Sequence, residues 1–382
     1  MKTPVQIFDE WLLKGNLGRR FHPIPAEIAA PFMNQLALFA QRMNLLRETF
    51  LPSHKIEIYA DFVDDGECNA CAGIHDSMGL VAINRGTILL NIEMFNRMFS
   101  HPVVLSNIGN SKNERRSGRH SEGMPTNYDD LIDMRRKAGR SLFSPPPLDN
   151  DRQGVAQMCI EMAWSFIVMH EITHIVHGHV DYLRATRQMR SILELAADGS
   201  VASGNDLDRQ AIELWADNRA ASVVFRGLMK KTTGPFVNRL FPLPAGKLFI
   251  WAFAVFSLFR LWGLKFELMS LQHPTHPPTL LRFEMVLLYA QIEFCQEFPE
   301  LSDMFWTVVT DARIEADSAF AYCGSPRLQP SDISDMRHPA AVAHIDILTA
   351  HMTEVFGPKL RRYSYTRLDN PPSPQSAVQL KP

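Results

Sequence analysis

Residues 170–179 read HEITHIVHGH and place four histidines and one glutamate within ten positions. The residues before them, VAQMCIEMAWSFIVM, carry apolar side chains at helical spacing, which predicts a helix that enters from the core. On this helix His170 and His174 lie one turn apart on one face, so both imidazoles can bind one zinc ion. Glu171 points about 100° away, toward a metal-bound water, as a general base requires.

The end of this helix is predicted at Gly178, because glycine is common just after the last helical residue. His177 and His179 therefore lie at the C-terminus of the helix, and we expect them to support the ligands or cap the helix rather than bind metal. The metzincin spacing would require glycine at 177 and histidine at 180. The chain has His177 and Val180 there, which excludes that pattern.

A third metal ligand is needed, and a glutamate from a later helix can supply it. Two segments offer one, ELAAD at 194–198 and ELWAD at 213–217. We favour Glu213, because residues 206–225 can form one long helix whose small alanines would let it lie close to the histidine helix. Glu194 remains the alternative, although a glycine soon after it would end its helix.

Asp217 lies one turn after Glu213 on the predicted helix. From that position its carboxylate can accept a hydrogen bond from a ligating imidazole and fix the tautomer of the ring. A solvent-exposed aspartate on a helix surface is the alternative interpretation.

The segments before the histidine helix predict a small sheet and an α+β fold. KIEIYADF at 55–62 alternates apolar and polar residues, and CNACAG (68–73) and GLVAIN (79–84) are further strand candidates. A helix is expected around 87–99, and helices dominate from 153 onward. The polar stretch 106–152 predicts an insertion or mobile loop.

Composition and charge predict an ordinary globular protein. The chain has 382 residues, is 46% hydrophobic and carries a formal net charge of −2, so no nucleic-acid partner is expected. Its N-terminus lacks a signal-peptide core and its five cysteines are sparse, which favours the cytoplasm. The longest apolar run, 248–259, is short for a membrane span and predicts a buried helix; peripheral or inner-membrane association is the alternative.

We expect four units along the chain. They are an N-terminal helical segment (1–54), a domain with the histidine helix and the polar insertion (55–295), a C-terminal helical segment (296–365) and a disordered tail (366–382).

HEITH followed by ELWADNRAA resembles the gluzincin metallopeptidases, in the branch that contains the heat-shock membrane peptidases, the CAAX prenyl endopeptidases and the Lit-like phage-exclusion peptidases. CNACAG resembles the Asn-Ala-x-Ala segment of that branch. THPPTLLRF (275–283) resembles its His-Pro-x-x-x-x-Arg segment, with His276 and Arg282 in the matching places. The resemblance covers roughly residues 55–290. The membrane branch has clear transmembrane helices, whereas this chain has only a weak candidate at 248–264.

The resemblance implies a mainly helical zincin-type domain with a small mixed sheet whose edge strand receives an extended substrate. The strand near 69–72 or the strand at 79–84 would hold the substrate by main-chain pairing, and Asn69, Ala70 and Ala72 would bind it. His276 or Arg282 would stabilise the charge that develops on the scissile carbonyl oxygen. A Lit-like protein would also stay dormant until it is triggered.

Together these features predict a zinc-dependent endopeptidase. His170, His174 and Glu213 would bind the zinc, Glu171 would act as general base, and a protein or peptide would be the substrate. The alternative is a zinc-binding regulatory or interaction protein that uses the same scaffold and cleaves nothing.

Overall fold

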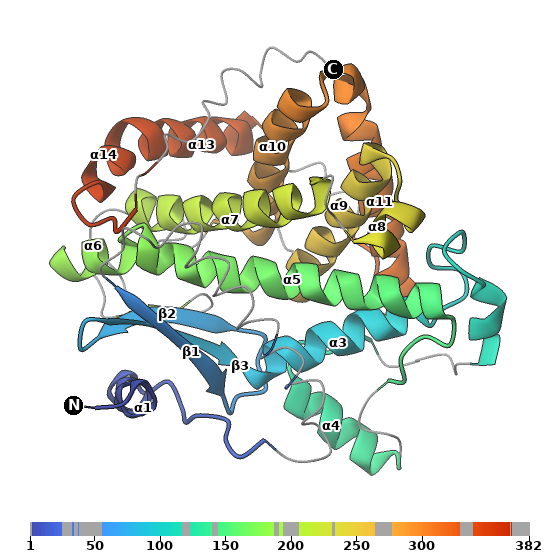
Figure 1. The fold of residues 1–382 in the computed structure, drawn as a ribbon, viewed down its shortest axis with the longest axis horizontal. Helices are drawn as coiled ribbons and strands as arrows, with labels where there is room; N and C mark the ends of the chain where they lie inside the picture. The colour runs from blue at the N-terminus through green and yellow to red at the C-terminus, as the bar shows by residue number, and fades with distance from the viewer. Residues whose placement is uncertain are drawn as a thin grey trace.

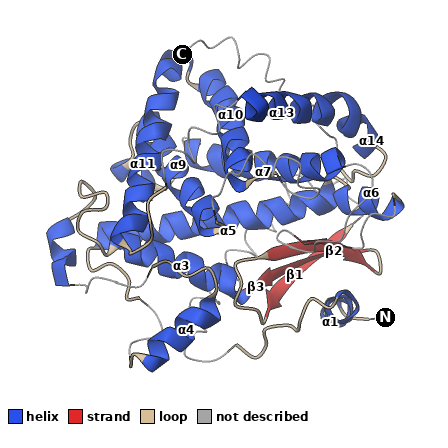
Figure 2. Cartoon of the chain, turned by 180° about the vertical axis from the view of Figure 1, so that it is seen from behind, coloured by secondary structure: helices blue, strands red, loops and turns tan. Residues whose placement is uncertain are grey.

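The computed structural model describes residues 2–24, 33, 37, 56–116, 123–139, 144–186, 191–193, 206–230, 234–263, 277–328, 339–366 and 368. The long helix α5 (Asn150–Val176) runs through the middle of the molecule, with a small sheet on one side and most other helices on the opposite side (Figures 1 and 2).

The strands are β1 (Glu57–Val63), β2 (Ala70–His75), β3 (Met78–Asn84) and β4 (Ser191–Leu193). The remaining helices of the first half are α1 (Pro4–Gly15), α3 (Arg85–Phe99), α4 (Tyr128–Lys137) and α6 (His179–Ala185), with the 3-10 turn η1 (Ser111–Arg116). The second half contains α7 (Asp206–Met229), α8 (Pro235–Leu240), α9 (Pro244–Leu261), α10 (Thr279–Glu297), η3 (Pro299–Met304), α11 (Phe305–Tyr322), α13 (Pro339–Ala350), the π-helical turn η5 (His351–Phe356) and α14 (Gly357–Leu360).

The sheet is mixed, with strand order β1-β3-β2-β4. Strand β1 pairs with β3 in parallel, whereas β2 pairs with β3 and with β4 in antiparallel orientation. The predicted α+β class, the three predicted strands and the helix expected around 87–99 are confirmed, with bounds that shift by a few residues.

Side chains alternate between the two faces of the sheet, as the period of a strand requires. One face carries Cys71, Leu80 and Ala82, which pack with the apolar side of α1 in a small core of their own. The other face carries Ala72 and Val81, which belong to the main core together with α5. The sheet is therefore buried on both sides, and α5 lies directly on its inner face.

The two ends of helix α5 are set by a capping aspartate and by a glycine. The Asp149 side chain accepts the backbone N–H groups of Asp151 and Arg152, which caps the first turn. At the other end Gly178 takes a positive φ of 78°, the left-handed conformation that glycine adopts without strain, so the predicted end of the helix is confirmed.

Helix α9 contains the longest apolar run of the chain. It packs against α11, α5 and α7, and 72% of it is buried inside the protein. It is the one helix among the described residues that is long and apolar enough to cross a membrane. Its burial on several sides confirms the prediction of a core helix.

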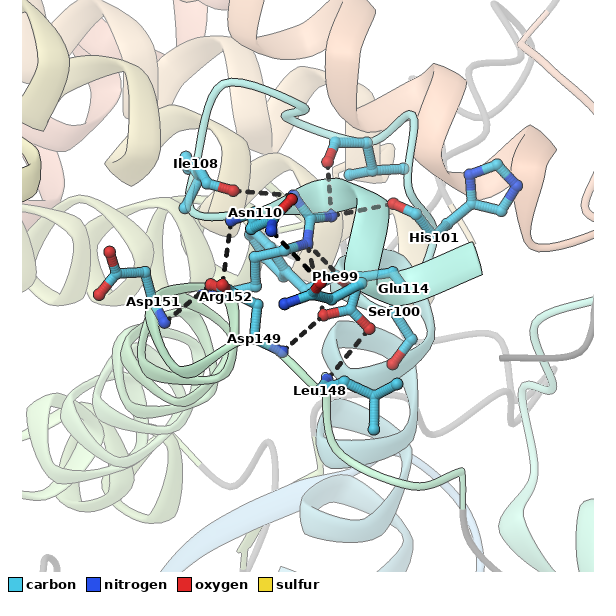
Figure 3. Close-up of polar contacts among 12 residues, drawn as sticks. Phe99, Ser100, His101, Ile108, Asn110, Glu114, Leu148, Asp149, Asp151 and Arg152 are labelled. Atoms are coloured by element: carbon cyan, nitrogen blue, oxygen red, sulfur yellow. Dashed lines mark hydrogen bonds and ion pairs between the residues drawn. The ribbon is translucent and has the colours of Figure 1, made fainter. Parts of the chain in front are cut away.

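The start of α5 is held by a buried arginine (Figure 3). Arg152 is fully buried and donates hydrogen bonds of 2.7–3.2 Å to five backbone carbonyls, those of Phe99, His101, Val104, Leu105 and Ile108. Glu114 lies 3.9 Å from it and accepts the backbone N–H groups of Leu148 and Asp149. Residues 101–116 are thereby tied to the helix that carries the histidines.

A second buried cluster holds α4 against α3. The Glu93 carboxylate contacts the Arg97 and Arg135 guanidinium groups, and it accepts hydrogen bonds from the backbone N–H and hydroxyl of Ser144 at 2.9 and 2.8 Å. The predicted polar insertion over 106–152 thus contains η1, α4 and the start of α5 in its described parts. Ion pairs and hydrogen bonds to the backbone order these elements together with buried apolar side chains such as Ile108, Tyr128 and Leu131.

One continuous core extends from Phe21 to Leu360 and includes residues of α11, α13 and η5. The C-terminal helices pack on α9 and α7 rather than forming a separate body. Beyond residue 366, all of the predicted tail except Leu368 lies outside the described residues.

Candidate metal centre

Helix α5 brings His170, Glu171 and His174 into the interior, and each side chain is at most 1% exposed. The apolar side of the same turns packs on the sheet, where Ile175 lies so close to Gly79 that an added Cβ would come within 2.8 Å of it. Because that side faces the sheet, the histidines face the neighbouring helix α7 (Figure 1).

Helix α7 lies along α5 and supplies two acidic side chains. Ala216 and Ala220 are fully buried, and such small residues allow two helices to approach closely. Glu213 and Asp217 follow one another at a spacing of one turn and are 3% and 0% exposed. The predicted long helix across 206–225 is confirmed.

Three ligand-type atoms converge between the two helices. His170 Nε2 lies 2.9 Å from His174 Nε2 and 3.4 Å from Glu213 Oε2, and His174 Nε2 lies 3.8 Å from Glu213 Oε1. Ligands that surround zinc tetrahedrally at about 2.0–2.1 Å are about 3.3 Å apart. The separations between the two imidazole nitrogens and the Glu213 carboxylate, 2.9–3.8 Å, therefore bracket the spacing that a tetrahedral zinc ion requires.

His170 is oriented by an acidic partner. Its Nδ1 lies 2.9 Å from Asp217 Oδ1, so the ring donates this N–H to the carboxylate and leaves the lone pair of Nε2 facing Glu213. Asp217 is itself held by Arg282, whose Nε and Nη2 donate to its two oxygens at 2.7 and 2.9 Å. Burial alone would raise the pKa of Asp217, but the Arg282 charge and the hydrogen bonds from Arg282 and His170 hold that pKa below its ordinary value.

His174 has a neutral partner instead. Its Nδ1 lies 3.0 Å from Nδ1 of His179, which is fully buried. Burial lowers the pKa of His179 well below its ordinary value, so the ring is neutral and its Nδ1 can accept the N–H of His174. The lone pair of His174 Nε2 then also points toward Glu213.

The donor set therefore fits a zinc ion. Two imidazole lone pairs and one carboxylate converge in a buried place, each imidazole is oriented by a partner on its far nitrogen, and Glu171 is not among the converging atoms. This matches the expected division between three ligands and one neighbouring carboxylate.

The structure places the other predicted residues as follows. Arg282 lies beside Asp217 with its charge over the rings of Phe259 and Trp262, and its Nη2 is 3.8 Å from Glu213 Oε2. Glu194 and His276 lie outside the described residues.

The two candidate substrate strands are β2 and β3, and neither is the outermost strand of the sheet. Ala70 and Ala72 are buried and pair with β3, while Cys71–Gly73 pair with β4 on the opposite side. Asn69 uses its side-chain oxygen to accept the backbone N–H of Ala70. Along residues 71–73, the side of β2 that was expected to receive substrate is therefore covered by residues 191–193 of the chain itself.

Sequence reasoning missed the aromatic surroundings of His177 and His179. Trp215 donates its indole N–H to His177 Nδ1 at 2.8 Å, and Phe356 packs near His179 with ring centroids 6.1 Å apart. Trp215 belongs to the ELWAD segment, which the sequence had already singled out. Nothing in the sequence around Phe356 indicates that Phe356 lies near the histidines.

A family model described as Peptidase U49 matches residues 124–299, somewhat less than half of the chain. The matched region contains His170, Glu171, His174, Glu213, Asp217 and Arg282. No curated protein and no solved structure matches the chain. The similarity to Peptidase U49 supports a peptidase.

Proposed function

We propose that the protein is a zinc-dependent endopeptidase whose metal ligands are His170, His174 and Glu213. The observation that carries the proposal is the convergence of His170 Nε2, His174 Nε2 and the Glu213 carboxylate, buried between α5 and α7 at separations of 2.9–3.8 Å, which bracket the spacing of ligands around a tetrahedral zinc ion. The similarity to Peptidase U49 agrees with it. A cytoplasmic location remains part of the proposal.

Zinc held by these residues would polarise the scissile carbonyl and lower the pKa of the attacking water toward 7. Glu171 would accept a proton from the water as its oxygen attacks the carbonyl carbon, and would pass that proton to the leaving amine as the C–N bond breaks. Its place on α5, beside the ligands but outside their triangle, is what supports this role. His170 and His174 keep their orientation because Asp217 and His179 bind their far nitrogens.

For Arg282 we propose a positioning role rather than direct contact with the carbonyl oxygen. Its Nε and Nη2 are both engaged with Asp217, and its guanidinium lies over two aromatic rings. Through Asp217 it fixes the tautomer and orientation of His170. The sequence assigned the oxyanion to Arg282 or His276, and the proposal keeps that role for His276, which lies outside the described residues.

The substrate proposed is a protein or peptide that binds in extended form along β2. Backbone pairing at a sheet edge gives affinity for many sequences, which suits a peptidase. Because β4 now pairs with Cys71–Gly73, a substrate that uses this stretch must displace residues 191–193.

The test uses the full chain, fluorescently labelled β-casein as a probe for unfolded substrate, and elemental mass spectrometry for zinc. We expect about one zinc per chain. Glu171→Gln should keep the zinc and lose cleavage, since it removes the base and no ligand. Glu161→Gln is the matched control: it lies on the same helix, bonded to Gln157, and should cleave like the unmodified protein.

The regulatory alternative makes the opposite prediction. A zinc-binding protein that cleaves nothing would hold the metal and show no difference between the unmodified chain and Glu171→Gln in any cleavage assay. Absence of zinc from protein prepared without chelator would contradict both functions.

A further inference from the structure

The C-terminal segment, residues 351–366, lies against the end of the helix that carries the histidines. The Val176 carbonyl accepts the backbone N–H of Tyr365 at 2.9 Å and the hydroxyl of Ser364 at 3.2 Å. The Tyr365 hydroxyl donates to Asp181 at 2.6 Å. Gly178 is so close to the Tyr363 backbone that an added Cβ would come within 2.3 Å of it. The segment therefore closes the end of α5 just beyond His174.

Within this segment Phe356 is fully buried beside the metal centre. Its ring lies 6.1 Å from the His179 ring, 5.3 Å from Tyr182 and 6.4 Å from Trp215, measured between centroids. Trp215 contacts His179 as well, at 6.5 Å and nearly perpendicular. The His179 imidazole thus packs among aromatic rings. Among the described residues, Phe356 is the one of these rings that comes from outside the region similar to Peptidase U49.

The turn that carries Phe356 is anchored by a buried acid. Asp208 on α7 is fully buried and accepts hydrogen bonds from His351 Nε2, at 2.6 Å, and from the Tyr182 hydroxyl. Lys359, which follows Phe356 in the sequence, has its Nζ 3.6 Å from the Asp208 carboxylate. Because Asp208 binds the chain both before and after Phe356, the ring has a defined place relative to α7 and α6.

We propose that Phe356 is a positioning residue of the metal centre: it holds the His179 imidazole so that His179 Nδ1 faces Nδ1 of the ligand His174. The inference rests on the proposed zinc site. Partners that orient a ligating histidine are worth about 10–100-fold in metal affinity. Removal of the Phe356 ring leaves a cavity beside His179, and the imidazole gains the freedom to turn away from His174.

The experiment measures zinc affinity of the full chain by competition with a chelator. Phe356→Ala should weaken zinc binding by about tenfold or more. Phe305→Ala is the matched control, because Phe305 is also a fully buried phenylalanine near the C-terminus but packs on Phe294 and Trp306. The Phe305→Ala variant should lose about as much stability as Phe356→Ala. Its zinc affinity should change less than threefold, because the proposed ligands and their partners are unaltered.

A double-mutant cycle separates positioning from general loosening. In a His179→Ala background there is no imidazole for the Phe356 ring to position. Phe356→Ala should therefore add little further loss of zinc affinity. Phe356→Leu, which keeps part of the volume, should fall between the unmodified chain and Phe356→Ala. It serves as the second variant if the alanine variant does not fold.

Two results would overturn the inference while leaving the zinc site intact. One is zinc affinity in the Phe356 variants that matches Phe305→Ala, and the other is an effect that adds in full to that of His179→Ala. If the unmodified chain binds no zinc, the proposed function itself fails, and the inference fails with it.

Discussion

Arg282 and Asp217 form a buried, bidentate ion pair, with Nε–Oδ2 and Nη2–Oδ1 distances of 2.7 and 2.9 Å. Asp217 also accepts the Nδ1–H of His170, so the arginine of α10 reaches the metal centre through one intervening carboxylate. This links a helix that begins at Thr279 to the first histidine of the motif.

Asp217→Asn is expected to lower zinc affinity by about 10–100-fold, because an amide is a weaker acceptor that no longer favours the required tautomer of His170. The measurement is chelator competition followed at constant pH. Unchanged affinity would show that the Asp217–His170 contact does not orient the ligand.

Arg282→Lys should keep the charge and still destabilise the protein by about 3 kcal/mol, because lysine cannot reproduce the two parallel hydrogen bonds to buried Asp217. Chemical denaturation with and without zinc measures this. A variant as stable as the unmodified chain would show that the bidentate contact between Arg282 and Asp217 does not contribute to stability.

The two candidate third ligands are separated by their alanine variants. Glu213→Ala should lose bound zinc, since its carboxylate lies 3.4 and 3.8 Å from the two imidazole nitrogens. Glu194→Ala should retain it. Loss of zinc from the Glu194 variant alone, measured by elemental mass spectrometry, would reassign the ligand.

The buried Glu93 carboxylate should make the free energy of unfolding depend on pH. Burial raises the pKa of Glu93, but the Arg97 and Arg135 charges and the Ser144 hydrogen bonds outweigh this and leave it below its ordinary value. A carboxylate with a lowered folded-state pKa stabilises the protein fully above the unfolded pKa of about 4.3, and this contribution is lost as pH falls through the folded pKa. The stability difference between the unmodified chain and Glu93→Gln should therefore be constant near neutrality and shrink below about pH 5. Urea denaturation across this range measures it; a difference that grew in acid would contradict the assignment.

The pairing of β4 with β2 can be tested by a disulfide. The register sets position 193 opposite Cys71, so Leu193→Cys should cross-link to Cys71 on oxidation, whereas Ile192→Cys, opposite Ala72, should not. Peptide mapping without reductant reports the bond. If substrate pairs along β2, the cross-linked protein should also lose β-casein cleavage and regain it on reduction.

Part of this protein was readable from local sequence. The four-residue spacing of His170 and His174 places them on one face of any helix, and Gly178 ends that helix because only glycine adopts its φ without strain. Alternation at 55–62 predicted a strand for the same kind of reason, a period of two enforced by the backbone.

Other features depended on contacts between residues far apart in the chain. Two similar acidic segments competed for the third ligand, and only the packing of α7 on α5 brought Glu213 to the histidines. Arg152 gave no signal, because its five acceptors are backbone carbonyls, which every residue carries. Phe356 and the pairing of β4 with β2 were equally invisible. Helical period and turn chemistry act within a few residues and follow from sequence alone, whereas close packing of a distant ring or strand is decided only when the whole core has formed.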